Sequence, residues 1–465
     1  MSNHRGESHV VVIGGGITGL ATAAHIAHGH PGVRVTLVEG SGRLGGVISA
    51  SPFAGLTSLD ESADAFLLRS PAATGLAALV GLGDELVHPA TGEAYIWHDE
   101  LHDIPSGTVL GVPGSLRSIW STSLYSPRGK LRASLEPLLP RRVGRSSASL
   151  GGTIRARCGR EVLERAVDPL VGGIYATDTD AFSVHAMPQL DDLISSRSSL
   201  MAAARETLRT RSDVGPVFAA PRRGMTALVE ATAEFIRRSG VDVRTSWAVT
   251  DVSRDADGYV VVGPDDAIRG DAVVVASPAR HSAHFMRTLS PVVADDLTTR
   301  EHASIVMVSL AIPRSQWPEW LTGSGYLVPK PKQTAITAAS FASNKWSHLR
   351  NTDDDMILRV SLGRDGMPMH HHDDDTLVRL ALADLNWHLD CDLQPRAQRI
   401  TRWVESFPQY RPGHEARVAA TEARLGIDAP GVVLAGASHR GIGIPACVAD
   451  GQRAASRVMD WLGSR

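Results

Sequence analysis

The first 40 residues alternate apolar runs with a glycine-rich break, and this pattern predicts a βαβ unit. Residues 10–13 and 33–38 predict two strands, and residues 20–27 between them are compatible with a helix. The break carries G-x-G-x-x-G at Gly14, Gly16 and Gly19, and Glu39 follows the second strand about 20 residues on. Such glycines allow a tight turn, close approach of the backbone to a diphosphate and close helix packing, while the acid binds a ribose. The pattern therefore predicts a dinucleotide site.

The residues after Glu39 favour FAD over NAD as the dinucleotide. Arg43 precedes Gly45 and Gly46, at a point where a nicotinamide enzyme would normally continue its sheet. An arginine and two glycines can supply a charge and close backbone contacts to a diphosphate that runs on towards a flavin. The alternative is a solvated loop charge beside a glycine turn.

A second glycine-rich signature closes the chain, from Gly436 to Gly451. Apolar residues 432–436 predict a buried strand, and Pro445 marks the first turn of the last helix, where its missing N–H costs nothing. That helix N-terminus, with Gly441 and Gly443 beside it, can bring N–H groups to the pyrimidine edge of a flavin, which gains negative charge on reduction. The alternative is a loop that needs glycine only for its turn.

The remaining pattern predicts an α/β protein with three parts. Helices are expected at 72–82 and 226–239, strands at 241–245, 259–262 and 271–277, and a last strand and helix at 431–434 and 446–462. Residues 281–419 are expected to mix short strands with helices. We predict a Rossmann-type FAD-binding domain assembled from three segments, a mixed α+β substrate-binding domain and an inserted helical module. Their expected bounds are 8–68, 216–280 and 420–465 for the first, 69–95, 187–215 and 281–419 for the second, and 96–186 for the third.

Composition excludes several classes of protein. The 465 residues carry a formal net charge of -3, so nothing attracts the chain to nucleic acid in general. Three separated cysteines indicate a reducing compartment without a disulfide or zinc framework. No apolar run is long enough to cross a bilayer, and we expect a cytoplasmic protein with at most peripheral contact to the inner face of a membrane. The basic residues of the helical module are the candidates for such contact, or form a merely solvated face: Arg128, Lys130, Arg132, Arg141, Arg142 and Arg145.

Several longer motifs resemble the oxygen-dependent porphyrinogen oxidases, flavoproteins of the monoamine-oxidase-like superfamily. They include E-x-x-x-R-L-G-G from Glu39, A-D-A-F-L at Ala63, G-G-I-Y-A-T-D at Gly172 and R-G-M-T-A-L at Arg223. The most specific are R-W-V-E-S-F-P-Q-Y-R-P-G-H from Arg402 and A-S-H-R-G-I-G-I-P-A-C from Ala437. The resemblance covers essentially the whole chain. Within the family, the sequence is most similar to the coproporphyrinogen III oxidases.

What the resemblance implies about the cofactor site is a set of FAD contacts along the chain. Besides Arg43, it comprises Gly14, Gly15, Gly16, Ile17, Thr18, Gly19, Glu39, Gly40, Val47, Ser62, Ala63, Asp64, Ala65, Val249, Trp403, Ala437, Ile442, Gly443 and Ile444. Three positions depart from the family pattern. Ser62-Ala63 replaces the usual Gly-Pro, Arg222-Arg223-Gly224 replaces a commoner Gly-Gly, and Ser361 stands where some relatives offer a tyrosine to the substrate.

The implied reaction needs no catalytic side chain, because the flavin carries the chemistry. A porphyrinogen loses six electrons in pairs, and oxygen regenerates the flavin. Gly172, Gly173 and Ile174 fit an apolar wall where a backbone carbonyl accepts a pyrrole N–H, and Arg69 is a candidate propionate clamp. Arg117 and Lys130 are further clamp candidates. The expected partners are a porphyrinogen, molecular oxygen and, transiently, a ferrochelatase, with the chain a monomer or homodimer.

Other readings of the same residues stay open. The substrate is coproporphyrinogen III or, as the alternative, protoporphyrinogen IX. An amine oxidase, a carotenoid desaturase, a mutase that uses reduced flavin and a haem-pathway binding module share the same scaffold. The run His370–His372 followed by three aspartates looks like a metal cluster, but consecutive residues cannot easily share one ion, and the acids suit the start of a helix. We expect no metal, and we interpret Cys447 as a packed residue and not as a flavin attachment point.

Overall fold

The computed structural model describes residues 7–196, 199–210, 215–350 and 354–465, and its first layer is a parallel five-stranded sheet. The strand order is β12 (Asp242–Arg244), β2 (Arg34–Val38), β1 (His9–Ile13), β16 (Ala272–Val275) and β22 (Val432–Leu434). Every residue of β1 is buried. Such a strand reads as a continuous apolar run because a central parallel strand is covered on both faces.

Alternate residues of β1 enter two different cores. Val10 and Val12 pack with α1 (Ile17–Gly29), α10 (Thr226–Arg238) and α17 (Ile444–Gly463) on one face. Val11 and Ile13 pack on the other face, against a three-stranded antiparallel sheet and two helices. These covering elements are β13 (Asp251–Arg254), β14 (Tyr259–Val262), β15 (Ala267–Gly270), α11 (Ala279–Phe285) and α12 (Pro291–Thr298).

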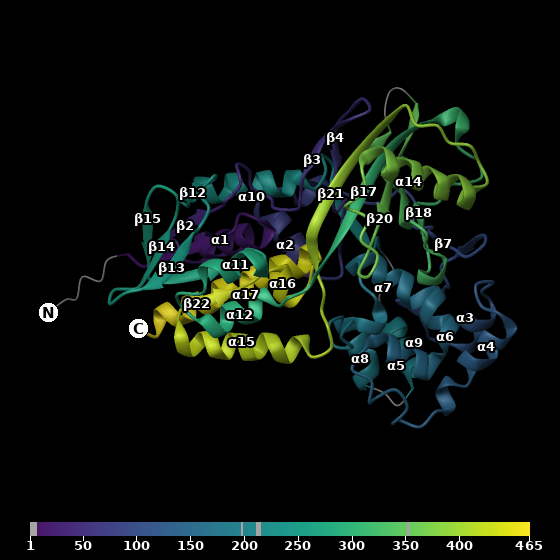
Figure 1. Cartoon of the computed structure of the whole chain (residues 1–465), viewed down its shortest axis with the longest axis horizontal. Helices are drawn as coiled ribbons and strands as arrows, with labels where there is room; N and C mark the ends of the chain where they lie inside the picture. The colour runs from purple at the N-terminus through teal and green to yellow at the C-terminus, as the bar shows by residue number, and fades with distance from the viewer. Residues whose placement is uncertain (1–6, 197–198, 211–214, 351–353) are drawn as a thin grey trace.

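The second layer is a seven-stranded mixed sheet that the sequence pattern did not reveal. Its order is β21 (Ala397–Pro408), β17 (His302–Pro313), β20 (Asp355–Leu362), β19 (Ile336–Phe341), β18 (Gly325–Leu327), β7 (Tyr95–Trp97) and β8 (Leu101–Asp103). The expectation of only short strands in this region is wrong, since β17 and β21 each span 12 residues. One face of the sheet packs on α14 (Asp374–Leu389), and the sheet lies at the upper right of the molecule in Figure 1.

The helical part lies beside this sheet, at the end of the molecule away from both termini (Figure 1). It contains α3 (Leu116–Trp120), α4 (Pro127–Ser134), α5 (Leu150–Cys158), α6 (Arg160–Val162), α7 (Asp168–Tyr175), α8 (Pro188–Ser196) and α9 (Leu200–Thr210). A π-helical stretch, Leu163–Val167, leads into α7. Leu190 on α8 and Leu200 on α9 share one core with Leu150 on α5. We therefore propose that this helical module extends to residue 210, past the expected end at 186.

Shorter elements complete the chain and support the cofactor side. The helices are α2 (Pro71–Leu79), α13 (Ala342–Lys345), α15 (His414–Asp428) and α16 (Ala437–Arg440). The strands are β3 (Ala50–Phe53), β4 (Leu56–Asp60), β5 (Phe66–Leu67), β6 (Leu86–Val87), β9 (Thr108–Val109), β10 (Val112–Pro113) and β11 (Phe218–Pro221). Within the described ranges, none of the helices combines the length and the apolar composition that a bilayer crossing requires.

Candidate functional site

The N-terminus of α1 forms a cradle with free backbone donors. Gly14 has φ +109° and Gly19 leaves no room for a side chain, since an added Cβ would lie 1.9 Å from the Gly14 carbonyl oxygen. An added Cβ on Gly16, by contrast, would meet nothing within 4 Å. In the described structure no acceptor faces the backbone N–H of Gly16 or Thr18. Open space in front of unpaired helix-terminal N–H groups is what a diphosphate needs.

Glu39 stands where β2 ends and is fixed by the backbone around it. Its Oε2 accepts the Gly15 N–H at 2.7 Å, and its Oε1 accepts the Ser41 N–H at 2.8 Å. The carboxylate is half-buried and the neighbouring Gly40 is exposed. Each oxygen keeps a lone pair for a ribose hydroxyl, so the geometry suits the predicted role.

The loop that follows is shaped by Arg43. Its guanidinium donates to the carbonyl oxygens of Gly46 at 2.7 Å and Ile48 at 3.1 Å. Gly45 donates to the Gly15 carbonyl at 2.8 Å, which ties this loop to the cradle, and Val47 at the loop tip is 50% exposed. Arg43 thus holds its own loop in the structure, and its contact with a diphosphate stays a prediction.

At the other end of the site, the turn before α17 presents three more unpaired donors. Among the described residues, none accepts from the backbone N–H groups of Ile442, Gly443 or Ile444. No side chain caps the 20-residue helix α17, whose positive dipole end lies here. Ala437 opens α16 just upstream, and Gly441 needs its glycine because φ is +123°. This arrangement suits a group that becomes negatively charged.

Cys447 lies under this turn and is inert in the structure. Burial raises the pKa of its thiol to about 12, and its Sγ lies 3.5 Å from the Gly441 carbonyl oxygen. A thiol with so high a pKa is a poor nucleophile. The observation supports the interpretation of Cys447 as a packed residue.

A third loop, residues 61–65, meets the seven-stranded sheet through charge pairs. Asp64 bonds Lys345 at 2.9 Å and Arg359 at 3.3 Å, and it accepts the Trp346 indole N–H at 3.1 Å. Burial alone would raise the pKa of Asp64, but Lys345 and Arg359 together hold it well below its usual range. Asp64 is therefore an anion that locks this loop onto the sheet.

The same loop carries the other predicted contacts. The Ser62 carbonyl accepts from Arg359, its buried Oγ has no partner, and Ala63 is exposed while Ala65 is half-buried. Trp403 on β21 donates its indole N–H to the Glu61 carbonyl at 2.9 Å, so it is pinned beside this loop.

Val249 lies elsewhere, as a half-buried residue against the core on the other face of the parallel sheet. Ala248, next to it in sequence, would lie 3.5 Å from a Cβ on Gly40, so Val249 lies near the Glu39 end of the cradle, and its contact with the adenine stays a prediction.

The predicted apolar wall on α7 approaches one end of a row of side chains on the seven-stranded sheet. The pairing register aligns one residue from each of five strands in a single row: Thr401, Met307, Ser361, Ala338 and Leu327. Their neighbours in each strand enter the core under α14, so the row points to the opposite face.

Helix α7 brings the wall to this row. A Cβ on Gly173 would lie 3.1 Å from the Leu327 side chain, and Ile174 is 42% exposed. Gly172 is buried against Arg364, where an added Cβ would lie 3.1 Å from Nη2. Arg364 has a structural role, because it pairs with buried Asp168 at 3.0 Å and also donates to the Thr177 carbonyl.

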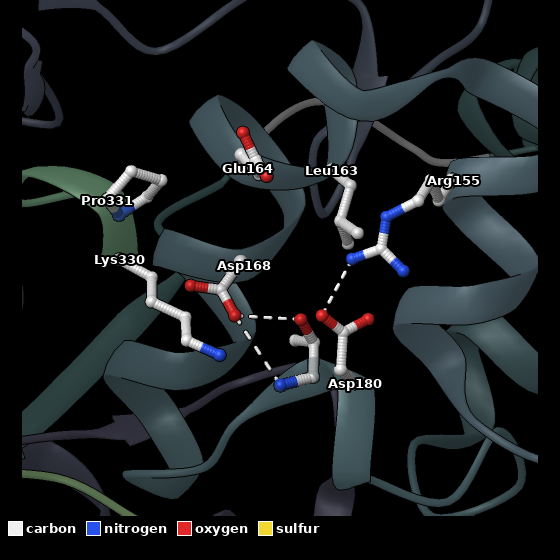
Figure 2. Close-up of a pocket in the computed structure, with 8 residues that line it drawn as sticks. Arg155, Leu163, Glu164, Asp168, Asp180, Lys330 and Pro331 are labelled. Atoms are coloured by element: carbon white, nitrogen blue, oxygen red, sulfur yellow. Dashed lines mark hydrogen bonds and ion pairs between the residues drawn. The ribbon is translucent and has the colours of Figure 1, made fainter. Parts of the chain in front are cut away.

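Asp168 also lines a surface pocket of about 260 Å³ behind α7 (Figure 2). Figure 2 shows Arg155 and Asp180 facing each other there, paired at 2.6 Å, with Lys330 approaching from the other side. Lys330 pairs with Asp178. Both cations of the pocket are thus neutralised by acids.

The three candidate propionate clamps lie in different surroundings. Arg69 is exposed after β5, and no hydrogen bond or ion pair to it is seen within the described residues. Arg117 is exposed on α3, which packs chiefly on α4 and β10. Lys130 on α4 donates to the Trp120 carbonyl at 3.2 Å. Arg117 and Lys130 therefore belong to the outer helices of the module and not to the wall around α7.

The aspartates that follow the histidine run have a structural role. Asp373 caps α14 by accepting the Thr376 N–H at 2.8 Å, as the position of the acids suggested. No group of residues within the described ranges has the arrangement that a metal ion requires.

Comparison with known proteins decides the family. The model of the flavin-containing amine oxidoreductases matches residues 17–459. The chain belongs to this family. It is a flavin oxidoreductase, and FAD is the cofactor that the family implies.

Individual relatives align over nearly the full length. The coproporphyrinogen III oxidase of Bacillus subtilis (strain 168) is 31% identical, over 98% of this chain and 99% of its own. The chloroplastic protoporphyrinogen oxidase of Oryza sativa subsp. japonica is 27% identical, over 98% of this chain and 89% of its own. A solved protein of Exiguobacterium sp. 255-15 superposes with a TM-score of 0.85 at 27% identity, over 98% of this chain and 99% of that one.

The residues present fit FAD at both ends. The open cradle at Gly16 and the fixed Glu39 suit the dinucleotide half, and the unpaired N–H groups before α17 suit the flavin. Sequence reasoning missed the side chains that hold the loops around the site in place, above all Arg359 and Lys345, which fix the 61–65 loop through Asp64. Tyr410, another of them, lies inside the R-W…P-Q-Y motif, so that motif was the available signal for it.

Proposed function

We propose that the protein oxidises coproporphyrinogen III to coproporphyrin III, using FAD and molecular oxygen and releasing hydrogen peroxide. The observation that carries the proposal is the alignment with the coproporphyrinogen III oxidase of Bacillus subtilis, at 31% identity over 98% of the chain. A substrate with four pyrrole rings is large and mostly apolar. A broad row of uncharged side chains facing a glycine-lined helix supports that substrate class.

Bound FAD supplies the redox chemistry, as acceptor of hydride from the substrate and donor of electrons to oxygen. The chain binds, orients and shields. The row of Thr401, Met307, Ser361, Ala338 and Leu327 contains no ionisable side chain, so it orients the ring system by contact. At the flavin end, the N–H groups of Ile442, Gly443 and Ile444 stabilise negative charge.

Substrate contacts on α7 follow from its glycines. Gly172 and Gly173 let the helix approach closely, and a backbone carbonyl near Ile174 is proposed to accept a pyrrole N–H. Arg69 is proposed as a propionate clamp, because it is exposed and no acid within the described structure pairs with it. Ser361 provides only a hydroxyl, so no phenol acts at that position.

Two alternative substrates are compatible with the same fold. Oxidation of protoporphyrinogen IX is favoured by the relative from Oryza sativa, whose sequence also covers 98% of this chain. An amine substrate is favoured by the family description alone.

Aerobic turnover on both porphyrinogens, side by side, tests the proposal. FAD-loaded protein should prefer coproporphyrinogen III and release about three peroxides per porphyrin, since six electrons leave in pairs. Preference for protoporphyrinogen IX would move the enzyme to the alternative. An Arg69→Ala variant should raise KM without loss of flavin, and an unchanged KM would remove Arg69 from the site.

A further inference from the structure

Three successive carbonyls of the flavin-edge segment, residues 437–439, are each held by a side chain from elsewhere in the fold. Tyr410 donates its hydroxyl to the Ala437 carbonyl. Arg300 donates to the Ser438 carbonyl at 2.9 Å, and the His414 ring contacts the His439 carbonyl at 2.9 Å. A four-residue helix cannot satisfy its own last carbonyls, so these donors fix its backbone from behind.

Arg300 is the charged residue among these three donors, and all five of its N–H groups have acceptors. Nη1 donates to the Ser438 carbonyl and lies 3.3 Å from Nδ1 of His439. Nε and Nη2 donate to the Asp296 carboxylate at 3.3 and 2.8 Å, and Nη2 also donates to the Thr421 hydroxyl at 3.3 Å. Only 5% of the side chain is exposed. A guanidinium so fully engaged has one orientation.

The positive charge stays on Arg300. An arginine has no acceptor, so Nδ1 of His439 must be the unprotonated nitrogen of a neutral ring. Burial, and then the charge of Arg300, lower the pKa of His439 well below its usual value, which agrees with a neutral ring. His414 approaches the same segment, and burial lowers its pKa too. Asp296 is shared between Arg300 and Arg417, so two cations face one acid.

We propose that Arg300 is a positioning residue for the flavin: it fixes residues 437–439, just before the turn that carries the flavin-facing donors at residues 442–444, and its buried charge favours the electron-rich flavin. The proposal rests on the cofactor position given under the proposed function. The helix end at Gly443 and a cation behind Ser438 act in the same sense, because both oppose the cost of negative charge on the pyrimidine ring. Charge effects of this kind are strong where water is excluded.

Sulfite binding tests the proposal without any substrate. Sulfite adds to oxidised flavin and leaves negative charge on the pyrimidine ring, so its affinity reports the local charge. FAD-loaded Arg300→Gln should bind sulfite about tenfold more weakly, and its two-electron potential should fall by the equivalent, about 30 mV. Arg300→Lys keeps the charge but loses the fork that bonds Ser438, Asp296 and Thr421 together, so its sulfite affinity should fall between those of the parent and Arg300→Gln.

Arg417→Gln is the matched control, because Arg417 bonds the same Asp296 but is 40% exposed and donates to no carbonyl of the segment. It should leave sulfite affinity unchanged. An unchanged affinity in Arg300→Gln, or an equal loss in Arg417→Gln, overturns the proposal. If Arg300→Gln fails to retain FAD, Arg300→Lys decides: a tenfold loss there also overturns it. None of these readouts uses a porphyrinogen, so failure of the proposed reaction would be seen separately.

Discussion

Asp64 lies between two cations, half-buried Lys345 and buried Arg359, where the 61–65 loop meets the seven-stranded sheet. Lys345 and Arg359 both contact it, and the Arg359 side chain is only 4% exposed. Removing one member of a buried pair leaves an uncompensated charge, which costs far more than an exposed pair contributes.

Asp64→Asn should therefore lower the free energy of unfolding by about 3 kcal/mol. Urea denaturation of the FAD-loaded protein measures this. Asp99→Asn is the control, since Asp99 pairs with Lys332 but is 62% exposed, and it should cost less than about 1 kcal/mol. Equal effects of the two variants would contradict the role of Asp64 as a buried lock.

Asp60 has the opposite electrostatic character. Burial raises its pKa to about 6, although Arg359 and the Met225 N–H at 2.9 Å oppose the rise. Because the folded pKa lies above the unfolded one, the group contributes stability at low pH that is lost as pH rises through about 6. Asp60→Asn stays neutral and keeps an acceptor for Met225.

Relative to the parent, Asp60→Asn should thus gain about 2 kcal/mol of unfolding free energy between about pH 4.5 and about pH 8. Urea unfolding of both proteins at the two pH values measures the difference. A difference that does not depend on pH would show that Asp60 titrates normally.

At this scale, sequence reasoning found the residues whose role follows from local geometry. Gly14, Gly19 and Glu39 are recognisable because a turn, a close contact and a strand end recur at fixed spacing. Arg300 and Arg359 were not found, since what matters is which acid or carbonyl they meet across more than a hundred residues. Nothing in the local pattern separates them from solvated arginines.

Between elements, the contact that most directly shapes the cofactor site is the packing of α1 against α17. The two N-termini carry the donors at opposite ends of the site, and Gly451 on α17 permits their approach. A Cβ there would lie 2.5 Å from the Thr18 carbonyl oxygen. Backbone atoms cannot move aside as a flexible side chain can.

Gly451→Ala should therefore weaken FAD binding and lower the free energy of unfolding by about 1–3 kcal/mol. FAD titration of the apoprotein and thermal unfolding measure the two effects. Gly426→Ala on α15 is the matched control, because nothing lies within 4 Å of its added Cβ. It should be neutral or stabilising by up to about 1 kcal/mol. A neutral Gly451→Ala would contradict the tight packing of these helices.

The outer face of the helical module combines exposed apolar side chains with positive charge. Trp120, Leu131 and Leu138 are 54%, 60% and 79% exposed. Residues 104–160 contain ten basic residues and one acid, Glu136, which is buried against Arg157. Such a face suits the surface of an anionic bilayer.

We expect the protein to sediment with vesicles that contain anionic phospholipid and not with zwitterionic ones. Raised salt should weaken the binding, and Arg141→Glu with Arg142→Glu should lower it about tenfold or more. The control reverses Arg237 and Arg238, another exposed pair, on α10. Equal sedimentation with both vesicle types would show that this face is only solvated.

Helices and strands could be predicted from the sequence where buried and exposed positions alternate regularly along the segment. The expected helix at 226–239 and strand at 259–262 match α10 and β14 closely. The strand β17 was not recognised because nearly all of its residues are buried, so it shows no alternation, and a register shift near Ala303 interrupts its pairing.

For the whole molecule, the resemblance and the glycine signatures were sufficient to predict an α/β flavoprotein. They were not sufficient to predict the uncharged row, which depends on the register of five strands that are distant in the sequence. The resulting architecture puts donors for a flavin on one layer and an uncharged row on another, with α7 bringing Gly173 to the row.

In the proposed reaction a porphyrinogen passes its electrons to bound FAD. Anaerobic mixing of the FAD-loaded protein with excess coproporphyrinogen III tests this step by itself. We expect the yellow flavin absorbance to be lost within the time of a single turnover and to return when oxygen is admitted, with coproporphyrin formed. A flavin that stays oxidised with coproporphyrinogen III and protoporphyrinogen IX, but is bleached by an amine, would show that the substrate is not a porphyrinogen.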